Sequence, residues 1–302
     1  MNYEEKIKNY RSIFETSFQE FLESEADKKQ IPPKLFEAMA YSLRAGGKRI
    51  RPILCMAGAE LSGIENFSEK VLPIAIALEF FHTSTLIHDD MPCMDNDELR
   101  RGKPTCHVMF GEALALLAGD AIPLLGIKHA IEGLIKNQIP LENIINALMI
   151  FLESAGAAGV LGGQSLDIES GEAKSMEDII ITTSMKTGDL IKASVKTGAV
   201  IAGIVGEELK SVDSYGYYLG TCFQIIDDVL DVTASAKDIG KTPGKDKKQG
   251  KSTFVGLLGI EEARMLAESC TNNAIKALDA SFSGENGEFL RDFAKNLLNR
   301  AY

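Results

Sequence analysis

The spacing of hydrophobic residues predicts helices along almost the whole chain. Apolar residues recur every three or four positions in "NYRSIFETSFQEFL", "KLFEAMAYSLRA" and "YGYYLGTCFQIIDDVLDV", which is the period of an α-helix. Alanine, leucine, glutamate, lysine and methionine, all strong helix formers, are abundant. Short alternating runs bounded by hairpin turns, which mark strands, are essentially missing. The pattern therefore predicts an all-α protein built as a bundle of roughly ten or more helices.

Proline and glycine clusters interrupt this pattern without producing a linker. Breaks are expected near residues 31–33, 46–47, 92–104, 140, 171–175, 206 and 238–250. None of these segments is long enough, or biased enough in composition, to separate two domains. Several helices are apolar on all sides, as is typical of helices inside a large core. We therefore expect one domain covering residues 1–302.

The composition limits the partners and the compartment. A net charge of −11 over 302 residues argues against a broad nucleic-acid-binding face, which would be basic. Five scattered cysteines, none in a C-x-x-C pair, fit a reducing compartment. The N-terminal residues lack the apolar segment of a signal peptide, and no apolar run approaches the ~18–20 residues of a membrane span. We expect a cytoplasmic protein without a membrane span or a nucleic-acid partner.

Two clusters of aspartates follow apolar helical segments. They lie in "LIHDDMPCMDNDELRRGKPTCH" (86–107) and "FQIIDDVLD" (223–231). In the second cluster Asp227 and Asp231 project within ~40° of each other, one helical turn apart. In the first, Asp89 and Asp95 would lie ~120° apart on an unbroken helix, but Pro92 disfavours helical geometry at the residue before it. The helix should therefore end near residue 90, and the chain can loop back to bring Asp95 beside Asp89.

Each cluster has two interpretations. A solvated helix end would explain either cluster alone. However, like charges on one helical face repel, and acidic residues at a helix C-terminus oppose the helix dipole. Two such clusters together favour a divalent-cation site, with ligands Asp89, Asp90, Asp95, Asp227, Asp228 and Asp231. A set made only of carboxylates favours Mg²⁺ held together with phosphate oxygens, and the EF-hand pattern is absent.

Basic residues accompany the acidic clusters in four places. "GGKRIRP" (46–52) contains Lys48, Arg49 and Arg51 behind two glycines; Arg100 and Arg101 follow the first aspartates; "MKTGDL" contains Lys186 and Thr187; and "GKTPGKDKKQGKSTF" contains Lys241 and Lys251. Arginine side chains suit two-pronged contacts with phosphate. Each patch alone could be solvated surface. No P-loop is present, which argues against nucleotide hydrolysis.

Two further features allow both a structural and a functional interpretation. His82 lies seven residues before Asp89 and within ~20° of the same helical face, so it is either a core histidine or a ligand contact. The stretch "SAGAAGVLGGQSLD" has glycines at helical spacing, which allow close helix packing. Alternatively it lines the same cavity, with Gln164 and Asp167 as its polar end.

Five motifs together resemble one enzyme family. "GGKRIRP", "LIHDDMPCMDNDELRRGKPT", "GGQSLD", "KTG" and "FQIIDDVLD" occur in the order and spacing of trans-isoprenyl diphosphate synthases, and the resemblance covers nearly the whole chain. The chain looks most similar to the bacterial short-chain branch, the farnesyl diphosphate synthases or geranyltranstransferases. In that branch the first aspartate motif is D-D-x₄-D.

The resemblance implies head-to-tail prenyl transfer in isoprenoid biosynthesis, on an all-α isoprenoid synthase fold that normally forms a homodimer. The substrates would be isopentenyl diphosphate with dimethylallyl and then geranyl diphosphate. Three Mg²⁺ ions, replaceable by Mn²⁺, would bind the six aspartates. The implied catalytic residues are Asp89, Asp90, Arg100, Lys186 and Asp227. The implied substrate-binding residues are Gly47, Lys48, Arg51, His82, Arg100, Arg101, Lys186, Thr187, Gln224, Lys241 and Lys251.

The product length depends on the helix before the first aspartates. At 1.5 Å per residue, Thr85 lies ~6 Å and Phe81 ~12 Å from Asp89 along the axis. We expect Phe80 or Phe81 to close the tunnel at a C15 product. Farnesyl-type enzymes often have an aromatic residue where this chain has Ser84, so a C20 geranylgeranyl product is the alternative. A terpene cyclase and a non-catalytic subunit of a heteromeric synthase are the more distant alternatives.

Overall fold

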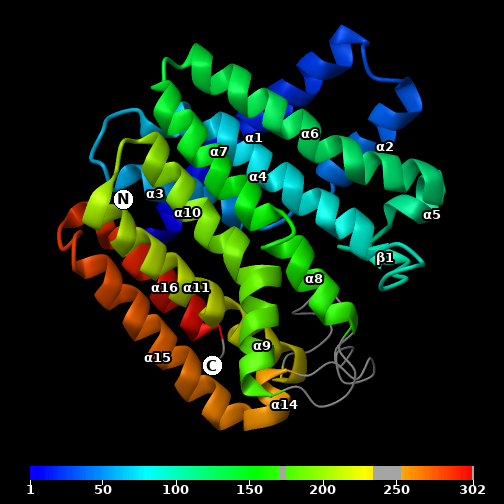
Figure 1. Cartoon of the computed structure of the whole chain (residues 1–302). Coiled ribbons are helices and arrows are strands. Elements are labelled where there is room, and N and C mark those ends of the chain that lie inside the picture. Colours follow the sequence, from blue (N-terminus) through cyan, green and yellow to red (C-terminus); the bar gives the residue numbers. More distant parts are fainter. Residues whose placement is uncertain (170–174, 234–252, 301–302) are drawn as a thin grey trace.

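The computed structural model describes residues 1–169, 175–233 and 253–300, and almost all of them are helical (Figure 1). This confirms the predicted all-α class. The α-helices are α1 (Tyr3–Lys28), α2 (Pro33–Leu43), α3 (Ile50–Glu60), α4 (Phe67–Asp89), α5 (Cys106–Phe110), α6 (Glu112–Lys136), α7 (Leu141–Ala155), α8 (Val160–Glu169), α9 (Met176–Thr183), α10 (Asp189–Ile201), α11 (Gly206–Thr233), α14 (Phe254–Leu258), α15 (Ile260–Asp279) and α16 (Glu288–Asn299). A π-helical turn, η1 (Ser184–Gly188), joins α9 to α10, and a 3₁₀ turn, η2 (Glu285–Gly287), precedes α16.

Local sequence explains where several helices begin and end. α1 begins with a capping box in which Asn2 and Glu5 exchange side-chain and backbone hydrogen bonds. Prolines precede or open α2 and α7, where a missing N–H does no harm. α4 ends at Asp89, just before Pro92, as the sequence predicted. The predicted break at 238–250 lies outside the described residues.

Helix α4 runs through the middle of the bundle and is buried along most of its length (Figure 1). It packs against α6 on one side and against α3, α10 and α1 on others. Helix α10 in turn packs against α3, α7 and α11. The aspartates at the end of α4 are therefore attached to the most enclosed helix of the fold.

Helices α3 and α10 cross so closely that glycine is required on both. A Cβ atom on Gly58 would lie 2.0 Å from the Val195 carbonyl oxygen, and one on Gly198 would lie 1.8 Å from the Cys55 carbonyl oxygen. Interiors packed this tightly transmit small displacements. The crossing thus fixes the residues at the start of α3 relative to the π-helical turn that precedes α10.

A short hairpin departs from the sequence expectation. Strands β1 (Leu99–Arg100) and β2 (Lys103–Pro104) pair antiparallel around a two-residue turn, in which Arg101 and Gly102 have positive φ angles of 54° and 75°. Such turns match the twist of a hairpin. Strands of two residues are too short to give an alternating pattern, so the sequence did not reveal them.

The expectation that no segment reaches the length of a membrane span needs correction. By length and composition, α4, α6 and the segment Leu141–Glu169 are each apolar enough to cross a membrane. Isolated polar residues interrupt the apolar runs but leave the mean hydropathy high. The apolar window of α4 is 72% buried inside the fold, whereas the windows of α6 and of 141–169 are only 33% and 39% buried. An apolar surface therefore covers α6 and α7, and its exposed side chains are Leu116, Leu117, Leu124, Ile131, Ile135, Leu141, Ile145, Met149 and Leu152.

Candidate active site

The chain after α4 folds back so that the first three aspartates lie together. The Asp95 N–H donates to the Asp89 carbonyl over 2.8 Å, and the Asp97 N–H donates to the Asp90 carbonyl over 3.1 Å. The return of Asp95 to Asp89 that Pro92 predicted is therefore present. Burial raises the pKa of Asp89, and the neighbouring carboxylates of Asp95 and Asp90 raise it further. A carboxylate in this position binds protons or cations readily.

Lys186 is the cation that faces Asp89. It is carried by the π-helical turn η1, which packs against α8, α10 and α11; such turns are frequent at functional sites. Its positive charge opposes the rise in the pKa of Asp89, and its Nζ donates to Asp167 of α8 over 2.7 Å. Asp167 thus lies at the site, which agrees with the interpretation that the glycine-rich stretch lines the same cavity. Gly163 allows α8 to approach this closely, because a Cβ at that position would lie 2.3 Å from the Lys186 backbone nitrogen.

The second aspartate cluster divides into two roles. Asp228 is buried, and its carboxylate accepts from the Gln224 side-chain amide over 2.8 Å and from the Phe254 N–H over 2.9 Å. Gln224 also accepts from the Thr187 hydroxyl over 2.9 Å. These bonds tie α11 to the π-helical turn and to α14. Asp227 instead lies near Lys48, just before α3, and Arg51, in its first turn, because its charge partly opposes the lowering of both pKa values by burial.

The carboxylates suit a divalent cation that arrives with a phosphorylated ligand. Within residues 1–169, 175–233 and 253–300, no group of three or more His, Cys, Asp or Glu side chains is close enough to hold a metal ion by itself. Mg²⁺ usually binds through one or two carboxylates, with water and phosphate oxygens as the remaining ligands. Carboxylates in small groups, with the pKa values of Asp89 and Asp90 raised by burial, therefore fit Mg²⁺ completed by a diphosphate.

A cluster of cations lies on the α3 side of the site. Burial lowers the pKa of Arg51 to about 10, and among the described residues its Nε is a buried polar atom without a hydrogen-bond partner. A Cβ on Gly47 would lie 2.9 Å from the Arg101 guanidinium, so the backbone and this side chain are in contact. Burial and the charges of Arg51 and Arg101 hold the pKa of His82 well below its usual value, which keeps the imidazole neutral. Burial likewise lowers the pKa of Lys48.

The arrangement of these groups is that of an anion-binding site. Cations that lower one another's pKa values are stabilised when a polyanion binds between them. A buried Nε–H with no acceptor costs free energy until a ligand accepts from it. The structure places Gly47, Arg51, His82 and Arg101 near one another, and Lys48 lies beside Gly47 in the chain and near Asp227.

Two arginines behave differently from the sequence expectation. Arg49, considered with Lys48 and Arg51, turns into the core and pairs with Glu15 and Glu79. Arg100 is bound to Asp90 through its Nε at 2.7 and 3.0 Å and through Nη2, and lies 3.6 Å from Asp97. The pair fastens the hairpin to the end of α4. Neither partnership is visible in the spacing of residues along the chain.

The residues proposed to set the product length point in different directions. Phe80 packs against Phe18 and Phe21 of α1, whereas Phe81 meets Phe151 of α7 edge to face, with ring centroids 5.9 Å apart. The hydroxyls of Ser84 and Thr85 bond to carbonyls of their own helix, those of Phe81 and His82. Phe81 therefore faces α7, with Phe151 as a partner that the sequence did not predict, whereas Phe80 is packed against α1. Lys241 and Lys251 lie outside the described residues.

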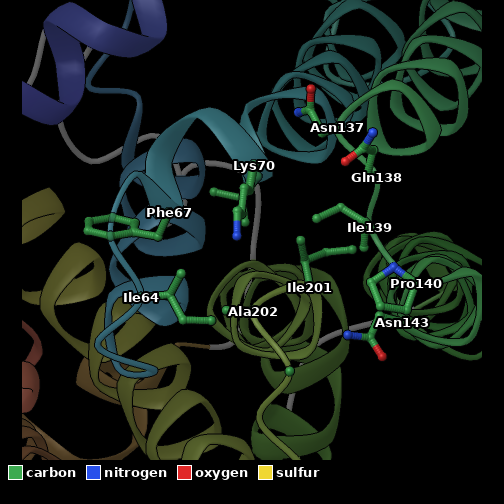
Figure 2. Close-up of a pocket in the computed structure, with 12 residues that line it drawn as sticks. Ile64, Phe67, Lys70, Asn137, Gln138, Ile139, Pro140, Asn143, Ile201 and Ala202 are labelled. Atoms are coloured by element: carbon green, nitrogen blue, oxygen red, sulfur yellow. The ribbon is translucent and has the colours of Figure 1, made fainter.

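A surface pocket of about 240 Å³ lies far from these residues (Figure 2). It is lined by Phe67 and Lys70 at the start of α4, by Asn137 and Pro140 between α6 and α7, and by Ile201 at the end of α10, among others. The aspartates lie at the opposite end of α4. This pocket is therefore separate from the candidate active site.

Comparisons with known proteins agree on one family. The family described as polyprenyl synthetase matches residues 32–282. A dimethylallyltranstransferase of Fischerella ambigua is 44% identical over 254 residues, which cover 82% of this chain and 71% of that protein. The heterodimeric geranylgeranyl pyrophosphate synthase large subunit 1, chloroplastic, of Arabidopsis thaliana is 41% identical over 248 residues, which cover 80% of this chain and 66% of that protein. The crystal structure of a geranyltransferase from Legionella pneumophila superposes with a TM-score of 0.84 at 30% identity, covering 99% of this chain and 97% of that one.

The ionised Asp89 carboxylate should lower the free energy of unfolding when no metal is bound. Its folded-state pKa is raised, so the ionised form disfavours folding above that pKa, and the penalty vanishes as the pH falls below the ordinary value of 3.8. We expect Asp89→Asn to raise the thermal unfolding midpoint in metal-free buffer at neutral pH, and the gain to shrink in acid. Asp27→Asn, a change at an exposed position of α1, is the control and should shift stability by only about ±0.5 kcal/mol. A destabilised Asp89→Asn protein at neutral pH would contradict this prediction.

Proposed function

Because the chain belongs to the polyprenyl synthetase family, it is a prenyltransferase, and we propose that it condenses isopentenyl diphosphate head-to-tail with dimethylallyl and then geranyl diphosphate. The observation that carries the proposal is the pairing of two charged surfaces. Asp89 and Asp95 lie together beside Lys186, and Asp227 lies near the separate cation cluster of Lys48, Arg51 and Arg101. One surface suits a metal-bound diphosphate, and the other suits a second diphosphate without metal.

The residues divide the work as follows. Asp89, Asp90, Asp95, Asp227, Asp228 and Asp231 would hold three Mg²⁺ ions, for which Mn²⁺ can substitute, with the allylic diphosphate. Metal ions held there would supply positive charge next to the leaving diphosphate. Lys186, with Arg100, Thr187 and Gln224, orients that group and adds positive charge where negative charge develops. Arg51, Arg101, Lys48, the neutral His82 and the Gly47 backbone bind isopentenyl diphosphate.

The bonds and protons balance without a side-chain base. The allylic C–O bond breaks, its electron pair leaves with the diphosphate, and the isopentenyl double bond forms the new C–C bond. The proton then lost from the isopentenyl unit goes to the departing diphosphate. Water must be excluded, since it would capture the allylic cation. The apolar residues of α4 below the aspartates provide that dry environment.

We propose farnesyl diphosphate (C15) as the product, with geranylgeranyl diphosphate (C20) as the second candidate. Phe81 lies eight residues before Asp89, about 12 Å along the helix, and its contact with Phe151 supports a tunnel that ends there. The small buried Ser84 leaves the upper tunnel open, which favours the longer product. Relatives such as the Arabidopsis protein are named for the C20 product.

We also propose that residues 1–302 form one synthase domain that acts as a cytoplasmic homodimer without a membrane span. The exposed apolar residues of α6 and α7 form a patch of the kind that marks an interface. A second copy of the chain would cover it. Exposed apolar side chains of this kind suit the apolar core of a homodimer interface.

The function is tested by incubating the protein with Mg²⁺, labelled isopentenyl diphosphate and geranyl diphosphate. We expect a C15 alcohol after dephosphorylation and no product when the metal is removed by chelation. A C20 alcohol would keep the reaction and replace the product assignment. Product formed from the allylic substrate alone would indicate a cyclase. If no condensation occurs, the chain is not an active prenyltransferase without a partner subunit.

The two adjacent phenylalanines provide a matched test of the tunnel. Phe81→Ala should shift the product to C20 or longer, because it removes one ring of the Phe81–Phe151 contact. Phe80→Ala, whose ring faces α1, should keep the wild-type product while losing about 3–5 kcal/mol of stability. Product length is read by chromatography and stability by urea unfolding. A longer product from Phe80→Ala alone would contradict this assignment.

The dimer is tested by placing a charge on the apolar surface. Leu124 is 69% exposed on α6, and Leu124→Glu should convert a dimer to a monomer in sedimentation velocity. Val205→Glu changes a residue that is 66% exposed but lies between α10 and α11, outside this surface, and should remain dimeric. A wild-type monomer that instead pellets with lipid vesicles would show that the surface binds membrane.

A further inference from the structure

A buried ion cluster lies beneath the cations of the site. Arg49 and Glu79 are only 3% and 2% exposed, and Arg49 Nη1 lies 2.8 Å from Glu79 Oε1. Arg49 also binds Glu15 through Nε at 2.8 Å and the Leu43 carbonyl through Nη2 at 3.3 Å. Its guanidinium lies over the rings of Phe14 and Phe18. Buried ion pairs are often no more stabilising than apolar residues of similar volume, so stability alone explains this cluster poorly.

The cluster coincides with a strained turn of the backbone. Arg49 precedes α3 in a left-handed conformation, with φ 53° and ψ 36°, and Gly46 and Gly47 before it have φ angles of 82° and 145°. An arginine in this conformation is unfavourable and persists only where its surroundings hold it. The ion pairs and ring contacts of the Arg49 side chain supply that restraint.

The strained turn places the groups that face the anion site. It puts Gly47 in contact with the Arg101 guanidinium, and α3, which starts just after it, carries Arg51. On α4, Glu79 lies one turn before His82, on nearly the same face. Burial lowers the pKa values of both Arg51 and Arg101, and the Glu79 charge partly opposes this lowering. Glu79 is thus near these cations, while its carboxylate is bound to Arg49.

We propose that Glu79 is a positioning residue of the isopentenyl diphosphate subsite: by anchoring Arg49, it holds the 46–49 turn so that Gly47, Arg51 and Arg101 converge on the diphosphate. This inference rests on the proposed function and goes beyond it, because it assigns a role to a carboxylate that touches neither metal nor substrate. It also explains why this chain has a negative charge beside the proposed anion site.

A purely electrostatic effect of Glu79 and a positioning role of Glu79 predict opposite results for the neutral variant Glu79→Gln. Removing a negative charge near the site would strengthen binding of an anion if charge alone mattered. If Glu79 positions the turn, the same change should weaken binding. A role in stability alone would reduce the amount of active enzyme, and hence the apparent kcat, without changing either KM.

The test is steady-state kinetics of Glu79→Gln with each substrate varied separately. We expect the KM for isopentenyl diphosphate to rise about tenfold, the equivalent of about 1.4 kcal/mol, with the KM for geranyl diphosphate and kcat nearly unchanged. Glu15→Gln is the matched control, because it removes the other carboxylate partner of Arg49, which is 32% exposed; its effect on the same KM should be smaller. An unchanged or lower KM for isopentenyl diphosphate in folded Glu79→Gln would overturn the inference.

A second variant covers the case in which Glu79→Gln does not fold. Arg49→Lys keeps the buried positive charge but cannot bind two carboxylates and a carbonyl at once, so the same selective rise in KM is expected. An equal loss for both substrates would overturn the inference. If the wild-type protein fails to condense the two substrates, the proposed function itself is wrong, so the two failures are distinguishable.

Discussion

The site depends on one physical constraint: charges of both signs must be held in a poorly solvated space before the ligands arrive. Helix α4 imposes it, because this buried helix ends in carboxylates and presents His82 toward arginines. Burial raises the pKa of Asp89 and lowers that of Arg51. Both shifts record the cost of ionised groups away from water. In the proposed function, metal ions bound at Asp89 would relieve the first cost and a diphosphate bound at Arg51 would relieve the second, so ligand binding would recover free energy lost on folding.

The surrounding helices make this arrangement rigid. The glycine crossing of α3 and α10 leaves no room for one helix to shift against the other, since a Cβ on Gly198 would overlap the Cys55 carbonyl. The π-helical turn before α10 carries Lys186, and Thr187 in the same turn binds Gln224 of α11. The cations of α3 and the groups that would hold the allylic diphosphate are thereby fixed to each other through helix packing. Preorganised charges of this kind need little rearrangement during a reaction.

The sequence indicated which residues carry the chemistry of the candidate site, but not which buried side chains hold those residues in place. Helical periodicity predicted the fold class, and Pro92 predicted the return of Asp95 to Asp89, because both are consequences of local backbone geometry. Arg49 was grouped with Lys48 and Arg51, since nothing along the chain shows that its partners Glu15 and Glu79 lie on other helices. Phe80 and Phe81 were likewise equivalent until packing turned one toward α1 and the other toward α7. Which way a side chain turns depends on tertiary contacts, which one sequence does not contain.

The site neutralises part of its own charge. Arg100 binds Asp90, and Lys186 binds Asp167, so two of the cations proposed to grip the allylic diphosphate are already paired with carboxylates. In the proposed function, Asp90 would be released to hold a metal ion and Arg100 would be released to bind phosphate oxygens of the allylic diphosphate. Replacing one ionic partner by another costs less free energy than leaving a charge unpaired in a low-dielectric space, where an unpaired ion is strongly disfavoured. On the side proposed for isopentenyl diphosphate, Arg51 Nε has no hydrogen-bond partner among the described residues, so no exchange of partners is available to it. There the proposed role of the buried Arg49–Glu79 pair is to hold the turn before α3 in place.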